Sequence, residues 1–235
     1  MPKDPPASPE TALEGASAAE PAPASGTKDR ILETAMRLFH EQGYNATGIS
    51  TILREAKVNA GSLYHFYGSK EALLVGVLQR YVEMLRPIVL EPQEQATDDP
   101  IERVFALLAW YRMGLEITGC TMGCPIGNLA IEVGDSHPNI RELIDLNFRN
   151  WSRGVRQWLD DAGDRLPPDT DREALSHFIL TVMEGAVMQA RASGDLVPYD
   201  ASVAQLRSYF DLLETAAPGG ARSRAKVSAR TEPLQ

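Results

Sequence analysis

Apolar residues between positions 27 and 215 recur three and four residues apart, which is the spacing of amphipathic helices. In the first such segment, Ile31, Ala35 and Leu38 share one face, and Gly43 is expected to end the helix. No segment alternates strictly between apolar and polar residues, and no Asn-Gly or Asp-Gly turn separates β-branched segments. The pattern therefore predicts an all-α protein.

Three more short helices are expected before position 87. The second contains Ile52 and has Thr47 as its N-cap, and the third ends near Gly68. Ser69 is expected to cap the fourth. Pro87 and the EPQEQATDDP segment should then break the helical path. Later helices are predicted at about 100–118, 125–133, 139–162, 171–193 and 201–215.

Composition sets the two ends of the chain apart from the middle. Residues 1–26 and 216–235 are poor in large apolar side chains, so we expect two disordered tails, the second of them basic. The net charge of −9 is not evenly spread. Residues 27–86 hold eight basic and six acidic side chains, whereas residues 87–215 hold ten and twenty-one. The acidity therefore lies mostly outside residues 27–86.

Targeting signals are not expected. No stretch approaches the roughly 18–20 apolar residues that span a membrane, and the first residues contain no apolar signal-peptide region. Two cysteines, Cys120 and Cys124, are too few for a secreted disulfide framework. A cytoplasmic protein without contact to a membrane is the resulting expectation.

A helix-turn-helix is expected at about 49–68. The segment reads ISTILREA, then the turn KVN, then AGSLYHFY. Its small core would include Ile52, Leu63 and Phe66, which would fix the angle between the two helices. Gly61 and Ser62 are small enough to let the second helix approach the bases in the major groove.

These residues carry a family resemblance. The run from Thr27 to Leu74 resembles the N-terminal domain of TetR-family transcriptional regulators in its I-L-x-x-A-x-x-L-F opening, its A-x-V-N-x-G-S-L-Y-H-F-Y centre and its S-K-E-A-L exit. The resemblance implies a three-helix helix-turn-helix DNA-binding domain at 27–86 that binds double-stranded operator DNA. By resemblance and position, Thr47, Lys57, Tyr67 and Lys70 are assigned to phosphates, and Asn59, Ala60, Gly61, Ser62, Tyr64 and His65 to the groove.

The resemblance also implies a role for residues 87–215. They would form a helical domain that binds a small-molecule effector and joins two subunits into a homodimer through its last two helices. Small residues such as Gly185 and Ala186 would let the partner helices approach closely. The side chains expected to contact the effector are Trp110, Met113, Cys124, Asn128, Phe148, Trp151 and Phe178.

The two cysteines allow two interpretations. Cys124 precedes Pro125 and would lie at a helix N-terminus, where the partial positive charge lowers a thiol pKa. Cys124, together with Cys120, could then sense oxidants or electrophiles. Alternatively, both are small buried apolar side chains, and this is the interpretation that we favour.

The sequence therefore predicts a ligand-responsive repressor, without cofactor or metal site, that binds a palindromic operator. Two alternatives remain. One is an enzyme, for which Cys124 and His137 are the sole candidate nucleophile and base. The other is an architectural DNA-binding protein without an effector.

Overall fold

The computed structural model describes residues 26–134 and 138–218, and every regular element in these ranges is helical. The all-α prediction is confirmed. Nearly all of the two expected tails, and His137 of the enzyme alternative, lie outside the described residues.

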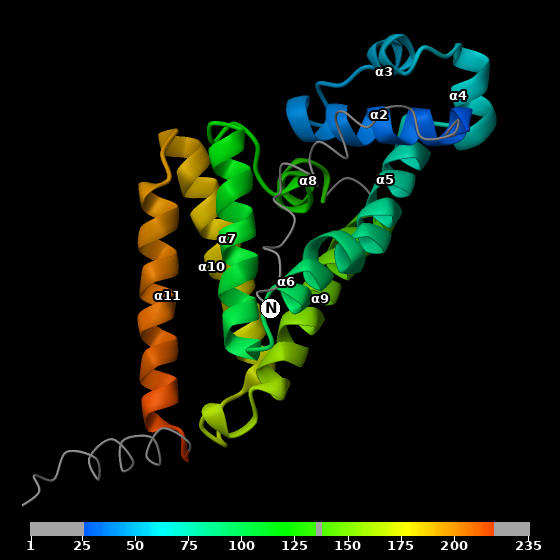
Figure 1. Ribbon diagram of the computed structural model, residues 1–235. Coiled ribbons are helices and arrows are strands. Elements are labelled where there is room, and N and C mark those ends of the chain that lie inside the picture. Colours follow the sequence, from blue (N-terminus) through cyan, green and yellow to red (C-terminus); the bar gives the residue numbers. More distant parts are fainter. Residues whose placement is uncertain (1–25, 135–137, 219–235) are drawn as a thin grey trace, which may run out of the picture.

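Four helices make up the N-terminal part, drawn in blue and cyan in Figure 1. Gly43, with a φ of 87°, follows the first of them as predicted, and its N–H donates to the carbonyl of Phe39. Ser69 caps the last one by accepting a hydrogen bond from the N–H of Ala72 at 3.0 Å, also as predicted. The helices are α2 (Thr27–Gln42), α3 (Ile49–Ala56), α4 (Ala60–Tyr67) and α5 (Lys70–Met84).

Thr47 does not cap α3, so that prediction is wrong. The N-cap residue is Gly48, which provides no side chain. Thr47 is instead fully buried, and its hydroxyl lies 2.7 Å from the carbonyl oxygen of Gly43 and 3.2 Å from that of Leu38. The hydroxyl therefore donates to carbonyls at the C-terminal end of α2, where the last carbonyl groups of a helix lack intrahelical donors.

Pro87 does not break the helical path either. Beyond α5 the chain continues through a π-helical segment, Leu85–Leu90, directly into α6 (Glu91–Ala96). A proline removes one N–H and crowds the preceding turn, and the wider π turn is one way in which a helix accommodates such a residue. The helical path ends later, at Thr97, where the backbone becomes extended.

Beyond α6, the C-terminal part contains five helices, and their predicted bounds are confirmed to within one residue at most ends. The last helix begins four residues earlier than expected, because Pro198 fits its first turn. A short 3₁₀ turn, Gly163–Arg165, follows the third of them. They are α7 (Pro100–Ile117), α8 (Pro125–Val133), α9 (Pro138–Asp161), α10 (Arg172–Ser193) and α11 (Val197–Ala216).

Two apolar cores hold these helices, and they do not follow the division of the chain into N-terminal and C-terminal parts. One core joins α7, the second half of α9, α10 and α11. The other contains the buried side chains of α2–α5 together with Leu129 and Val133 of α8 and Ile140 and Ile144 of α9. Figure 1 shows α8 lying between the N-terminal helices and α7. The helix-turn-helix therefore shares its core with two helices of the C-terminal part.

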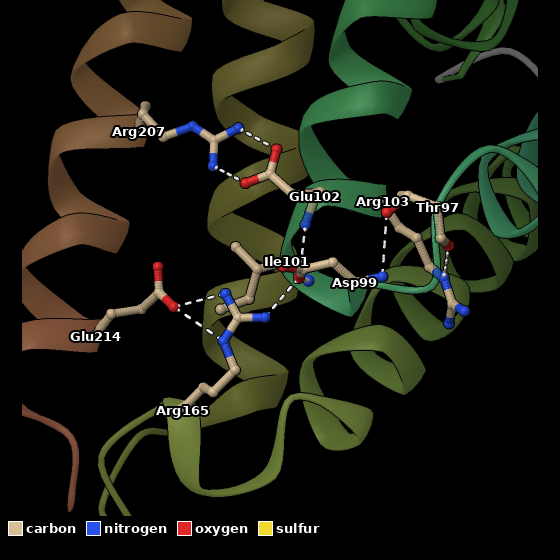
Figure 2. A network of polar contacts seen from close by, with 8 residues as sticks. All are labelled: Thr97, Asp99, Ile101, Glu102, Arg103, Arg165, Arg207 and Glu214. Carbon is tan, nitrogen blue, oxygen red and sulfur yellow. Dashed lines mark hydrogen bonds and ion pairs between the residues drawn. The ribbon is translucent and has the colours of Figure 1, made fainter. Parts of the chain in front are cut away.

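A polar network fastens α11 at its far end (Figure 2). The guanidinium of Arg207 donates to both oxygens of Glu102 on α7, at 2.5 and 2.8 Å. Arg165 donates to Asp99 at 2.6 Å and to Glu214 of α11 at 2.6 Å and 3.0 Å. Partly exposed ion pairs contribute only about 0–1 kcal/mol each, so their main effect is to fix the direction of α11.

Leu129 tests the shared core. It is buried, so Leu129→Ala should lower the free energy of unfolding by about 2–5 kcal/mol through the cavity that it leaves. Ile131→Ala is the matched control on the same helix, because Ile131 is 76% exposed and should change stability by less than about 0.5 kcal/mol. Urea unfolding measures both, and equal effects of the two substitutions would contradict the assignment.

Candidate DNA-binding surface and buried polar cluster

Helices α3 and α4 meet at a three-residue turn, as the sequence predicts for a helix-turn-helix. Lys57 adopts the left-handed conformation with a φ of 53° and ends α3, and the N–H of Val58 donates to the carbonyl of Leu53 at 3.1 Å. Leu63 anchors α4 in the core from its inner face. The opposite face of α4 is left for solvent.

Asn59 is the N-cap of α4. Its Oδ1 accepts a hydrogen bond from the N–H of Ser62 at 2.9 Å and one from the Ser62 hydroxyl at 3.1 Å. A side-chain acceptor at this position satisfies one of the free N–H groups at a helix start. Asn59 and Ser62 are therefore held in a fixed arrangement at the end of α4 that would enter a groove.

The outer face of α4 carries large side chains. Tyr64 is 51% exposed, and His65 is also exposed, beside the exposed Ala60 and Gly61. Phe66 is 39% exposed, so its expected place in the core is wrong. Its ring instead packs edge-on against that of His65, with centroids 4.9 Å apart, because Leu63 alone fills the core position at this level of α4.

The residues assigned to phosphates lie in different environments. Lys57 is exposed. The Tyr67 hydroxyl donates to the carbonyl of Lys28 at 3.1 Å. The Lys70 ammonium donates to the carbonyl of Tyr44 at 2.5 Å and lies 4.1 Å from the centre of the Tyr44 ring, and burial lowers its pKa. Thr47, whose hydroxyl is buried, is not accessible to a phosphate in this structure.

A cluster of polar groups lies inside the C-terminal part, and we call Tyr111, Cys124, Trp151 and Glu184 the buried polar cluster. The indole N–H of Trp151 donates to the hydroxyl of Tyr111 at 3.2 Å. Cys124 lies against the carboxyl group of Glu184, and burial raises the pKa of the Tyr111 hydroxyl, with smaller contributions from Cys124 and Glu184. Within the described ranges, Oε1 of Glu184 is buried without a hydrogen-bond partner. The cluster therefore holds an unused acceptor in an apolar setting.

Cys124 caps α8, as expected from its place before Pro125, and the N–H of Gly127 points to its sulfur at 3.5 Å. Burial nevertheless raises the pKa of the thiol well above its ordinary value, and the nearby Glu184 raises it further. These two effects exceed that of the helix N-terminus. The structure thus favours the interpretation of Cys124 as a buried, protonated thiol, and Cys120 is buried as well.

The remaining side chains expected to contact an effector do not form one group. Asn128 accepts a hydrogen bond from Arg191 at 2.7 Å, and the ring of Trp110 packs edge-on against Tyr111. Met113 is half-buried, and Phe148 packs against the core of the helix-turn-helix. Phe178 is 47% exposed on α10, so the structure does not support it as a lining residue.

Two members of the buried polar cluster, Tyr111 and Glu184, were not among the side chains expected to contact an effector. Tyr111 was hidden beside Trp110, although it continues the spacing of Val104, Leu108 and Leu115 along the inner face of α7. Glu184 carries no signal of burial, since a lone glutamate on a helix is usually exposed. Within the described ranges, no group of His, Cys, Asp and Glu is arranged to hold a metal ion. No described helix is long and apolar enough to cross a membrane.

Removal of the helix cap formed by Asn59 should lower the stability of the folded chain by a measurable amount. Asn59→Ala should lower the free energy of unfolding by about 0.5–2 kcal/mol, whereas Asn59→Asp keeps an acceptor oxygen and should stay near the wild-type value. His65→Ala is the control, because His65 is exposed on the same helix. Thermal unfolding would contradict the cap if the alanine variants at 59 and 65 were equally stable.

Glu184 makes stability depend on pH. Burial raises its pKa, and the Cys124 thiol offsets only part of the rise. The folded chain therefore holds this proton more tightly than the unfolded chain, so the free energy of unfolding falls as pH rises from about 4.3 through the raised pKa. In Glu184→Gln this contribution disappears, and the decline with pH should be shallower than in wild type.

Urea unfolding between pH about 4 and about 7 measures this decline. The exposed Glu142, replaced by glutamine, provides the control. Curves for Glu184→Gln and wild type that run parallel over this range would argue against a buried carboxyl group.

Comparisons with known proteins agree with this geometry. A family model described as "Bacterial regulatory proteins, tetR family" matches residues 31–77, and one described as "Tetracyclin repressor-like, C-terminal domain" matches residues 100–206. An HTH-type transcriptional regulator of Mycobacterium tuberculosis is 30% identical over 189 residues, covering 78% of this chain and 93% of the relative.

Two further proteins extend the comparison. The HTH-type transcriptional repressor NemR of Escherichia coli is 26% identical over 77% of this chain and 92% of its own length. The crystal structure of a TetR regulatory protein from Rhodobacter sphaeroides superposes with a TM-score of 0.71 at 22% identity, covering 79% of this chain and 97% of the other. With its helix-turn-helix, its helical C-terminal domain and these matches, the chain belongs to the TetR family of transcriptional regulators.

Proposed function

We propose that this regulator is a repressor that binds a palindromic operator as a homodimer and leaves it when a small-molecule effector binds. The observation that carries the proposal is the exposed face of α4, with Tyr64 and His65 projecting beside the cap formed by Asn59. Binding to operator DNA would place the protein in the cytoplasm.

The start of α4 would read bases in the major groove. Ala60 and Gly61 are exposed and small, so the backbone can approach closely, and Ser62, Tyr64 and His65 offer donors and acceptors. Lys57 would meet a phosphate directly. Lys70 and Tyr67 would do so by exchanging their backbone acceptors, Tyr44 and Lys28, for phosphate oxygens. Thr47 is left out of this set because its hydroxyl is buried.

An apolar surface on α10 and α11 supports the homodimer, and we call it the dimer surface. Its large members are exposed in the single chain: Phe178 and Met188 on α10, and Val197, Tyr209 and Leu212 on α11. A methyl group added at Gly185, on the same face as Phe178 and Met188, would meet nothing within 4 Å. Exposed apolar side chains on two adjacent helices are typical of a subunit interface.

The buried polar cluster is the proposed place of effector binding. The unpartnered oxygen of Glu184 and the Tyr111 hydroxyl are polar groups that could orient a ligand among apolar side chains. The effector would act by favouring a dimer whose two reading helices are no longer about 34–36 Å apart, the length of one turn of DNA. The protonated thiol of Cys124 favours this over sensing by a thiolate, and over catalysis by a thiol nucleophile.

Selection of bound fragments from a random DNA pool tests this function. The wild-type chain should enrich an inverted repeat, and compounds should then be found that release it. Leu212→Glu, at a position that is 67% exposed, should weaken dimerisation by at least about tenfold, since a carboxylate would be buried against apolar side chains. DNA affinity should fall with it.

Sedimentation gives the dimer dissociation constant in this test. Ile131→Glu is the matched control, because Ile131 is exposed on α8, outside the dimer surface. Enrichment of no repeat, or of a single half-site by a monomer, would overturn the proposed function.

A further inference from the structure

Glu132, in the last turn of α8, binds a loop of the DNA-binding part. One carboxylate oxygen accepts the N–H of Tyr44 at 2.9 Å, and the other accepts the N–H of Asn45 at 2.6 Å. Both donors belong to the loop between α2 and α3, which lies 87 and 88 residues away in sequence. Hydrogen bonds to an ionised carboxylate are about twice as strong as those between neutral groups, and two together fix a direction as well as a distance.

The loop that Glu132 holds is itself closely fitted. Gly43 has a φ of 87°, and a methyl group added there would lie 3.2 Å from each oxygen of Glu132. From the other side, the Lys70 ammonium donates to the carbonyl of Tyr44. The peptide groups of Tyr44 are thus held between a carboxylate of α8 and an ammonium of α5. Because this loop leads directly into α3, its position determines where the helix-turn-helix lies relative to α8.

The opposite end of α8 contacts the buried polar cluster. Cys124 is the N-cap of this nine-residue helix, and Gly127, in its first turns, lies so close to Glu184 that a methyl group added there would force the carboxyl group of Glu184 to move. Just before the helix, the carbonyl of Gly123 pairs with Nε2 of His40 on α2 at 2.6 Å. Because Gly127 and Glu132 belong to the same nine-residue helix, a displacement of the whole helix at Gly127 would also displace Glu132.

We propose that Glu132 is a positioning residue that fixes the helix-turn-helix to α8 and passes movements of α8 to the reading helix. The inference rests on the proposed binding of operator DNA. It differs from a purely stabilising role, because the removal of Glu132 would change the spacing of half-sites that the dimer accepts. The proposal also gives a function to the hydrogen bonds between Glu132 and the loop before α3, which link two parts of the chain that already share an apolar core.

Hydrogen exchange tests the contact itself. In the full chain labelled with ¹⁵N-tyrosine and ¹⁵N-asparagine, Glu132→Ala should speed exchange of the Tyr44 and Asn45 amides by at least about tenfold, as expected when hydrogen bonds to a charged group are lost. Glu132→Gln should expose only one of the two amides, because its side chain offers one acceptor oxygen. Glu142→Ala is the control for the lost charge, as Glu142 is exposed on α9.

Operator spacing tests the positioning role. Wild type and each variant are titrated with the selected operator and with copies whose half-sites lie one base pair closer or farther apart. Wild type should discriminate against the altered spacings, and Glu132→Ala should reduce this discrimination by at least about fivefold, the lower range of coupling between sites. Glu132→Gln, which keeps the side-chain volume, should reduce it in the same direction if Glu132→Ala fails to fold.

The outcomes separate the two proposals. Unchanged exchange of Tyr44 and Asn45 in both Glu132 variants would overturn the contact. If the Glu132 variants exchanged faster at Tyr44 and Asn45 but kept the same spacing preference as Glu142→Ala, the positioning role would be overturned and the proposed function would remain intact. A wild-type chain that binds no operator would overturn the proposed function and, with it, the positioning role.

Discussion

The apolar core that the helix-turn-helix shares with α8 and the start of α9 is the contact on which the other features depend. Leu129, Val133, Ile140 and Ile144 pack into the same cluster as the buried residues of α2–α5. The buried side-chain amide of Asn147 adds a hydrogen bond from α9 to the carbonyl of Leu78 on α5, at 3.1 Å. Because packed cores change between discrete arrangements, a shift of α8 should displace the helix-turn-helix as well, which is the coupling that we propose.

The two ends of α8 differ in their polar contacts. At one end of α8, Glu184 keeps an unused acceptor beside Cys124, and at the other end Glu132 uses both of its oxygens on the loop before α3. The contrast suits the proposed function. The end of α8 next to the proposed effector site has a carboxyl oxygen without a hydrogen-bond partner among the described residues, whereas both carboxylate oxygens at the other end already accept hydrogen bonds. Cys124 caps the start of α8, and because burial raises the pKa of its thiol, we interpret it as a structural side chain at this end of the helix.

Much of the fold could be predicted from the sequence, because helix periodicity, Gly43, Ser69 and Pro125 act locally. The errors arose where neighbouring groups compete for one side chain or one core position. Thr47 bonds back to α2 rather than capping α3, and Phe66 is exposed because Leu63 already fills the core. The site was less predictable than the fold. The partners of Glu132 are 87 and 88 residues away, and no sequence spacing indicates such a pairing.

The central claim is that α8 and the helix-turn-helix form one cooperative unit. Native-state hydrogen exchange in increasing amounts of denaturant measures it most directly, by giving the opening free energy of amides in α2 and in α8. The account predicts that the most protected amides of the two helices converge on one opening free energy. It would be contradicted if α2 opened at a distinctly lower free energy while the amides of α8 stayed protected.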